Sequence, residues 1–222
     1  MDWFPLYNSL RIAVLSSVVV FFAGLAAAYY AARLPRLVKG ALDTVLTLPM
    51  VLPPTVVGYL LLLVFGNKRP LGQLLANFDI PFVMTWYGGV LAAAVVAFPP
   101  MYRTARGAFE SFDTTLAQAG QTLGLSNTFI FWRIRMPACR QGILAGVVLA
   151  FARALGEYGA TSMLIGYTPG RTATISTTVY QLWRTGDDAG ALFWVLVNLG
   201  ISAAVLLTVN WLERPAKGGP TP

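Results

Sequence analysis

The sequence predicts an all-α polytopic membrane protein with about five transmembrane helices and one long cytoplasmic loop. The chain has 222 residues, of which 56% are hydrophobic and only 11% are charged, a composition typical of integral membrane proteins. About five apolar segments are long enough to cross roughly 30 Å of hydrocarbon as helices. Lys and Arg lie between these segments, so the net charge of +7 reflects membrane topology and argues against nucleic-acid binding.

We interpret residues 1–222 as one transmembrane domain. The first apolar segment is longer than the apolar core of a signal peptide and is followed by the basic stretch RLPRLVK, which predicts a retained span. The third segment is short, and the Pro99-Pro100 pair ends it. The predicted spans cover residues 10–32, 44–65, 86–102, 142–165 and 191–212.

The second predicted span contains a Pro-Pro pair at mid-membrane. Pro53 and Pro54 lack backbone N–H groups and therefore force a kink or a break in the helix. Membrane helices tolerate this where neighbouring helices or a cavity satisfy the freed carbonyl groups. Two interpretations follow, a moving part of a pore or a static kink.

The fourth predicted span carries two opposite charges. Arg153 and Glu157 are four residues apart, so they share one face of a continuous helix. A charge near the bilayer centre costs at least roughly 2.5–3.5 kcal/mol. We therefore expect both side chains to face protein or water and to pair with each other.

The distribution of Lys and Arg predicts the orientation. The positive-inside rule places the richer side in the cytoplasm, so the N-terminus lies outside, the C-terminus lies inside, and the loop of residues 103–141 is cytoplasmic. The richer side holds Arg33, Arg36, Lys39, Arg103, Arg106, Arg133, Arg135, Arg140, Arg214 and Lys217, and the poorer side holds Arg11, Lys68, Arg69, Arg171 and Arg184.

The cytoplasmic loop has the local signals of two short helices. Asp113 is an N-cap for a helix through Leu123, and Gly124 then occupies a left-handed C-terminal position. Ser126 or Asn127 caps the second helix. That helix is expected to run through residue 135 before a proline at 137 stops it. The residues alone leave open whether this elbow merely lies on the membrane surface or binds a partner.

The same stretch carries a spaced motif. Gln118, Ala119 and Gly120 are followed after three residues by Gly124, and nine residues later by Ile134-x-Met-Pro. This pattern resembles the cytoplasmic signature of permease subunits of binding-protein-dependent ABC importers, EAA, three residues, G, nine residues, I-x-LP. Three identities differ from it, because Gln118 replaces glutamate, Gly120 replaces alanine and Met136 replaces leucine.

The resemblance implies that the elbow is a coupling helix that docks in a cleft of a separate ATP-hydrolysing subunit. The chain itself lacks a phosphate-binding GxxxxGK[ST] loop, so ATP and Mg are expected on the partner and no cofactor on this chain. No catalytic set is found either, which argues against an enzyme. With no His and a single Cys, a metal site is not expected. The residues assigned to coupling are Gln118, Ala119, Gly120, Leu123, Gly124, Ile134, Met136 and Pro137.

Two further stretches look like the corresponding spans of molybdate-type permeases. They run from Leu48 to Gly66 and from Leu149 to Thr161, and PGRTATISTTVY resembles the outer loop of that family. Sulfate/thiosulfate and tungstate permeases share parts of these motifs, so they are alternatives. The resemblance implies a prokaryotic cell-membrane importer that receives an oxyanion, with molybdate as the first candidate, from an external binding protein. Two copies of the chain are expected to form the pore, because five spans are too few to enclose a sealed path.

Within this interpretation, the candidate path or gate residues are Pro53, Pro54, Arg153 and Glu157. Arg153 would attract an oxyanion and Glu157 would oppose its prolonged binding, or the two form a structural pair that fixes helix packing. An ATP-independent carrier would show inverted repeats with broken helices in matching positions, and no such repeat is found. A membrane scaffold would not need the coupling signature.

Overall fold

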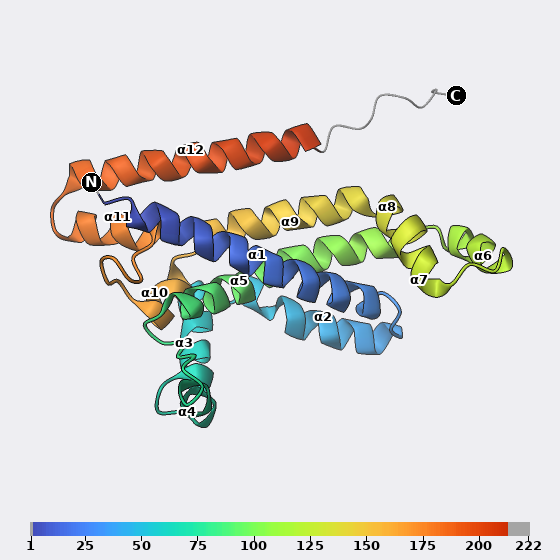
Figure 1. Ribbon diagram of the computed structural model, residues 1–222, viewed down its shortest axis with the longest axis horizontal. Helices are drawn as coiled ribbons and strands as arrows, with labels where there is room; N and C mark the ends of the chain where they lie inside the picture. Colours follow the sequence, from blue (N-terminus) through green and yellow to red (C-terminus); the bar gives the residue numbers. More distant parts are fainter. Residues whose placement is uncertain (1, 213–222) are drawn as a thin grey trace.

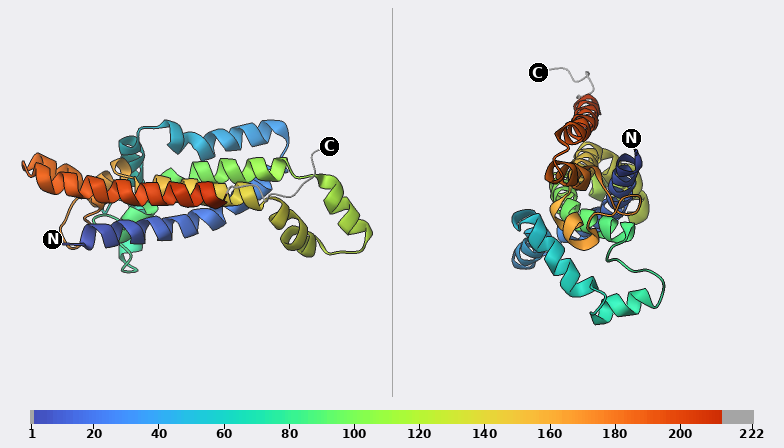
Figure 2. Two further views of the ribbon diagram at one scale, coloured as in Figure 1. Left: turned by 90° about the horizontal axis from the view of Figure 1, so that it is seen from above. Right: turned by 90° about the vertical axis from the view of Figure 1, so that its left-hand side faces the viewer.

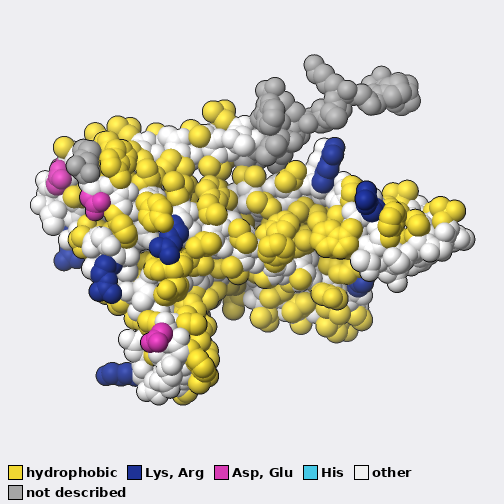
Figure 3. Space-filling model, in the orientation of Figure 1, with side chains coloured by type: hydrophobic (Ala, Val, Ile, Leu, Met, Phe, Trp, Pro, Cys, Tyr) yellow, Lys and Arg dark blue, Asp and Glu magenta, His cyan; other side chains and the backbone are white. Residues whose placement is uncertain are grey.

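The computed structural model describes residues 2–212, with side chains through residue 208. Every regular element in this part of the chain is helical (Figure 1). The molecule is elongated, with several long helices running roughly along its length (Figures 1 and 2). On the face drawn in Figure 3, hydrophobic side chains cover the middle, and most charged side chains lie toward the ends.

Three helices form the core of the bundle. They are α1 (Phe4–Ala31), α5 (Trp86–Glu110) and α9 (Arg140–Leu155), and α5 packs against both of the others. Small residues allow this close approach. A Cβ atom on Gly24 of α1 would lie 2.9 Å from Met101 Cγ, and one on Gly146 of α9 would lie 3.0 Å from Met101 Sδ.

Helix α5 corrects the prediction that the third span ends at Pro99-Pro100. The helix continues through both prolines to its end at Glu110. Pro99 is buried and Met101 and Tyr102 are fully buried, so packing against the neighbouring helices holds the segment in helical form despite the lost N–H groups. Tertiary packing here overrides the local preference.

The second predicted span is broken at its Pro-Pro pair. Helix α2 (Arg36–Val51) ends before it and α3 (Pro54–Phe65) begins within it, and the two axes differ by 112°. Of the two outcomes expected from the prolines, the structure therefore shows a break. A short helix, α4 (Pro70–Ala76), follows α3.

The fourth predicted span, residues 142–165, is not one helix. Helix α9 ends at Leu155, and α10 (Gly159–Ile165) begins after a short break. The chain turns there because α10 packs against α3, which fills the space beside the break. A Cβ atom on Gly58 of α3 would lie 2.8 Å from Ala160 Cα, so only glycine fits this contact.

The last two helices lie on the other side of the bundle. The amphipathic α11 (Ile175–Arg184) packs against α12 (Asp188–Leu212), which otherwise touches α9 (Figure 1). Within the described residues, α1 and α12 are long and apolar enough to cross a membrane, and up to four spans result if each of two bent helix pairs counts as one. The prediction of about five spans is therefore not confirmed. Helix α5 falls outside this count because its prolines and charged residues lower its hydropathy.

Candidate functional site

The coupling loop predicted at residues 103–141 forms one end of the molecule. Beyond the end of α5, the chain folds into α6 (Thr114–Thr122), α7 (Asn127–Ile130), a π turn η1 (Phe131–Arg135) and α8 (Met136–Ala138) (Figure 1). Helices α6 and α7 project past the three core helices. They lie where a partner outside the bundle can reach them.

Both short helices of this elbow have capped N-termini, as the sequence predicted. The Asp113 carboxylate accepts a hydrogen bond from Thr115 N at 2.9 Å and one from the Thr115 hydroxyl at 2.7 Å. The hydroxyl and then the amide hold the pKa of Asp113 below its usual value. In the second helix, Ser126 Oγ accepts from Phe129 N at 3.2 Å. Of the two residues considered for this cap, the structure selects Ser126.

The two helices are joined by a left-handed glycine. Gly124 has φ +75°, and its N–H donates to Gln121 O at 3.0 Å while Leu125 N donates to Gly120 O at 3.1 Å. These two bonds form a Schellman motif. A Cβ atom on Gly124 would meet nothing within 4 Å, so the backbone conformation, not space, requires glycine here.

A second glycine holds the two arms of the elbow together. Gly120 is buried, and a Cβ atom there would lie 3.1 Å from Ile130 Cγ1 and 3.3 Å from Ile134 Cδ1. On the surface, Gln121 Nε2 donates to Asn127 Oδ1 at 3.1 Å. The elbow is therefore a packed unit with its own small apolar contact.

The other residues of the motif lie mostly on the outside. Leu123 is 79% exposed at the tip of this projecting element. Ile134 and Met136 are half-buried. The exposed members are Gln118, Ala119, Leu123, Gly124 and Pro137.

The second arm differs from the prediction at its end. The helix was expected to stop before Pro137, but the chain continues as α8 through Ala138. The π turn precedes this segment, and Pro137 follows Met136 at the start of the new helix, where a missing N–H is tolerated. The direction changes only after Ala138, where the axis turns by 72° into α9.

An aromatic cluster attaches the elbow to the bundle. Tyr29 near the end of α1 lies 4.8 Å from Phe131 and 5.7 Å from Phe109, measured between ring centroids. The Arg135 guanidinium lies 4.9 Å from the ring of Phe112 and 5.5 Å from that of Tyr29. The elbow therefore packs on both α1 and the end of α5.

Helix α2 is tied to the same end of α5 by charged side chains, which we call the α2–α5 clamp. Asp43 pairs with Arg106 and accepts a hydrogen bond from the Tyr102 hydroxyl. Lys39 pairs with Glu110 at 2.9 Å. Sequence reasoning missed this clamp, although opposite charges recur at four-residue spacing on both helices.

The predicted pair Arg153 and Glu157 is formed, but not on one helix face. Helix α9 ends at Leu155, so Glu157 lies in the break before α10. Arg153 Nη1 lies 2.7 Å from Glu157 Oε2, close enough for an ion pair although not aligned as a hydrogen bond. Glu157 Oε1 accepts from Ala160 N at 2.7 Å. The Glu157 side chain is 1% exposed, whereas that of Arg153 is 37% exposed.

The predicted path residues meet where the two interrupted spans touch. A Cβ atom on Gly159 would lie 2.7 Å from Pro54 Cβ, so the α2–α3 break lies against the start of α10. Pro53 is exposed beside it. The structure thus brings Pro54 close to the segment that holds Glu157, and we call this contact the break junction.

Comparison with known proteins places this architecture in a family. Residues 21–217 match the family model described as the inner membrane component of binding-protein-dependent transport systems. The chain belongs to this family of permeases.

The permease is similar over nearly its whole length to characterised transport proteins. It is 40% identical over 215 residues to the molybdenum transport system permease protein ModB of Escherichia coli K12, covering 96% of this chain and 94% of that protein. It is 33% identical over 212 residues to the sulfate transport system permease protein CysW of Synechococcus elongatus, and the match covers 94% of this chain and 74% of that protein.

A solved structure shares the fold of the permease. The inward-facing MetNI methionine ABC transporter matches with a TM-score of 0.73 at 13% identity, and the match covers 95% of this chain and 93% of that one. At this identity the likeness concerns the fold alone.

Sequence reasoning also missed a buried polar network at the end of the permease opposite the elbow. Asn8 Nδ2 donates to Ala173 O at 3.0 Å, and Ser9 Oγ accepts from Ile175 N at 2.8 Å. Thr174 begins α11 with a reciprocal capping box to Thr177. The loop containing PGRTATISTTVY is therefore held against the start of α1. The sequence signal for this network was the presence of two polar residues, Asn8 and Ser9, in the first turns of an apolar helix.

Proposed function

We propose that this permease carries the oxyanion molybdate into the cell and is driven by ATP hydrolysis on partner subunits. The observation that carries the proposal is the combination of full-length similarity to a molybdenum permease with an exposed, capped elbow at the end of the bundle. Sulfate/thiosulfate and tungstate are the alternative cargoes, since the sulfate permease is also similar.

The elbow is the proposed contact for the ATP-binding subunits. Its two arms are preformed by caps, a Schellman turn and the Gly120 contact, so little ordering is needed on binding. Leu123 at its tip is exposed and apolar, as expected for the centre of an interface. ATP and Mg would be held by the partner and not by this chain.

The proposed orientation has the N-terminus outside and the elbow in the cytoplasm. Arg103 and Arg140 flank the elbow and Arg133 lies within its second arm, which the positive-inside rule assigns to the cytoplasm. Two of the predicted flanking residues, Arg214 and Lys217, lie outside the described residues. The family is one of inner membrane components, in agreement with a prokaryotic cell-membrane location.

Two copies of the chain are proposed to form the path. Helix α2 contributes no buried residue, and Leu37 and Val51 on it are 89% and 82% exposed. This leaves an apolar face for a second copy or for lipid. The break junction, with Pro53, Pro54, Arg153 and Glu157, is the proposed moving part beside the path, because interrupted helices are tolerated where they line a cavity.

Transport in reconstituted vesicles tests the function. The permease with its ATP-binding subunits is placed in vesicles with ATP inside and with the loaded binding protein outside, and the uptake of molybdate, tungstate and sulfate is compared. We expect ATP-dependent accumulation with molybdate preferred. Accumulation without ATP would show a carrier, and a complex that holds no ATP-binding subunit would overturn the coupling assignment.

A further inference from the structure

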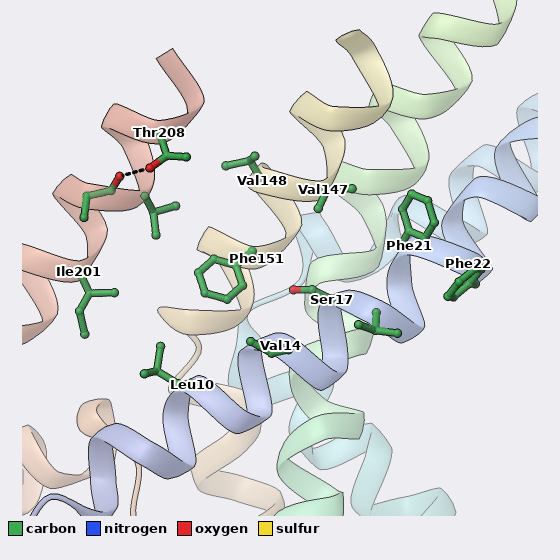
Figure 4. Close-up of a pocket in the computed structure, with 13 residues that line it drawn as sticks. Leu10, Val14, Ser17, Phe21, Phe22, Val147, Val148, Phe151, Ile201 and Thr208 are labelled. Carbon is green, nitrogen blue, oxygen red and sulfur yellow. Dashed lines mark hydrogen bonds between the residues drawn. The ribbon is translucent and has the colours of Figure 1, made fainter. Parts of the chain in front are cut away.

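A long apolar groove runs between α1, α9 and α12. Its volume is about 740 Å³. Figure 4 shows Leu10 and Val14 of α1, Phe151 of α9 and Ile201 of α12 around one open space. Helix α12 touches the bundle only through α9 and α11 among its larger contacts, which leaves this space beside α1 unfilled by protein.

The lining of the groove suits hydrocarbon only. The two hydroxyls that line it are bonded within their own helices. Ser17 Oγ donates to Ala13 O at 2.6 Å, and Thr208 Oγ1 donates to Ala204 O at 2.8 Å. The remaining lining side chains are apolar. Water or an oxyanion would find no partner there, whereas an acyl chain needs none.

The groove lies at membrane depth. Two of its three walls, α1 and α12, are the helices that are long and apolar enough to cross a bilayer. Proteins do not keep an apolar space of this size empty beside a fluid that fills it. The bilayer supplies that fluid as acyl chains.

A second, smaller groove continues the first toward the cytoplasmic end of α1. Its volume is about 280 Å³, and the two grooves share Phe22. Tyr29, Tyr30 and Trp132 line the continuation. These amphipathic rings are the kind that lies at the level of lipid headgroups.

Arg33 lies at this aromatic end. The guanidinium carbon of Arg33 lies 3.8 Å from the ring centroid of Tyr29, and Arg33 is exposed. The apolar groove and its continuation therefore end beside a positive charge.

We propose that α1, α9 and α12 bind an anionic phospholipid, with an acyl chain in the groove and the phosphate at Arg33. Cytoplasmic basic pockets between membrane helices suit such headgroups. A second copy of the chain is assigned instead to the exposed apolar face of α2, and a second copy in the groove is one of the outcomes that the test below distinguishes.

Two matched pairs of variants test the proposal. Val18 lines the groove and Val19 does not, yet they are neighbours on α1 with exposures of 50% and 54%. Val18→Trp therefore fills the groove, and Val19→Trp is its control. For the headgroup, Arg33→Gln is compared with Arg36→Gln, which changes a second exposed arginine just beyond α1.

The transporter is purified as the complex in which it assembles, stripped of lipid, and titrated with phosphatidylglycerol or phosphatidylcholine while bound lipid is counted by native mass spectrometry. We expect wild type to retain phosphatidylglycerol more strongly. Val18→Trp should lose both lipids. The Arg33→Gln variant should bind phosphatidylglycerol about fivefold more weakly. It should weaken phosphatidylcholine binding less, because the choline cation already offsets the charge of that lipid's phosphate. Both control variants should behave as wild type.

Three results would overturn the site. They are equal retention by Val18→Trp and Val19→Trp, equal affinity of wild type for the two lipids, and efficient disulfide cross-linking of two chains through a Val18→Cys variant. The last result would show that a second copy covers the groove.

Discussion

Asp43 of α2 accepts a hydrogen bond from the hydroxyl of Tyr102 on α5, although the two residues are 59 positions apart in the chain. Arg106, one turn further along α5, pairs with the same carboxylate. Because α5 leads directly into the elbow, this contact links the elbow to α2 and through it to the break junction. Any displacement of the elbow that carries α5 would therefore also reach α2.

The α2–α5 clamp should contribute to stability unequally through its two ion pairs. Asp43→Ala leaves the partly buried Arg106 and the buried Tyr102 without their partner, and we expect a loss of about 2 kcal/mol. Lys39→Gln breaks the more exposed pair with Glu110 and should cost less than about 1 kcal/mol. Thermal unfolding of the detergent-purified protein measures both. Equal losses of stability would show that the contacts of Asp43 contribute no more than the exposed pair of Lys39 and Glu110.

The elbow should depend on the backbone of Gly124. Gly124→Val places a β-branched residue at positive φ, which is strained. We expect normal membrane insertion, poor co-purification of the ATP-binding subunit and low uptake. Gly107→Val is the control, because Gly107 lies in α5 with open space around it and without positive φ. If both variants keep the partner, the elbow is not the coupling contact.

The Arg153 and Glu157 pair should respond asymmetrically to single changes. Arg153→Met leaves a buried carboxylate without its counter-charge, whereas Glu157→Gln leaves a cation that is partly exposed and keeps an oxygen for Ala160 N. We expect the first change to lower the yield of folded complex more, and the double variant to recover part of it. A double variant that assembles well but no longer transports would instead place Arg153 in the anion path. Yield, ATP hydrolysis and uptake are the three readouts.

Thiol labelling should distinguish the exposed tip of the elbow from its base. Burial raises the pKa of the Cys139 thiol, and its Sγ donates to Ala108 O at 3.2 Å. Cys139 should therefore react slowly with a maleimide near neutral pH and faster only above the usual thiol range, as the thiolate forms.

A Leu123→Cys variant should label rapidly at neutral pH and become protected when the ATP-binding subunit is present. The unchanged chain, with Cys139 alone, gives the background rate. Rapid labelling of Leu123→Cys in the full complex would argue against docking at the tip.

The elbow was predictable because its signals are local. The caps at Asp113 and Ser126 and the left-handed Gly124 each depend on a few neighbouring residues, and the structure contains all three. The identity of the partner surface is not encoded in this way. For that reason the roles of the motif residues stay predictions.

The sequence-based predictions were wrong or incomplete where contacts between distant segments determine the structure. Pro99-Pro100 would end an isolated helix, but packing of α5 between its neighbours carries it on to Glu110. No proline marks the break at Glu157. The break depends instead on the packing of α10 against α3. The partner of Asp43 could not be chosen from the sequence either, because several arginines lie in the loop predicted to be on the same side of the membrane.

The π turn at Phe131–Arg135 changes how the spacing of the motif should be counted. A π turn holds one more residue than an α turn, so the nine residues between Gly124 and Ile134, together with the turn that follows, include a built-in insertion. The widened turn absorbs this extra residue, so the helix before it and the helix after it keep nearly the relative rotation of a regular helix that is one residue shorter. A count of the motif in α-helical turns would therefore assign the wrong side chains to the face that contains Ile134.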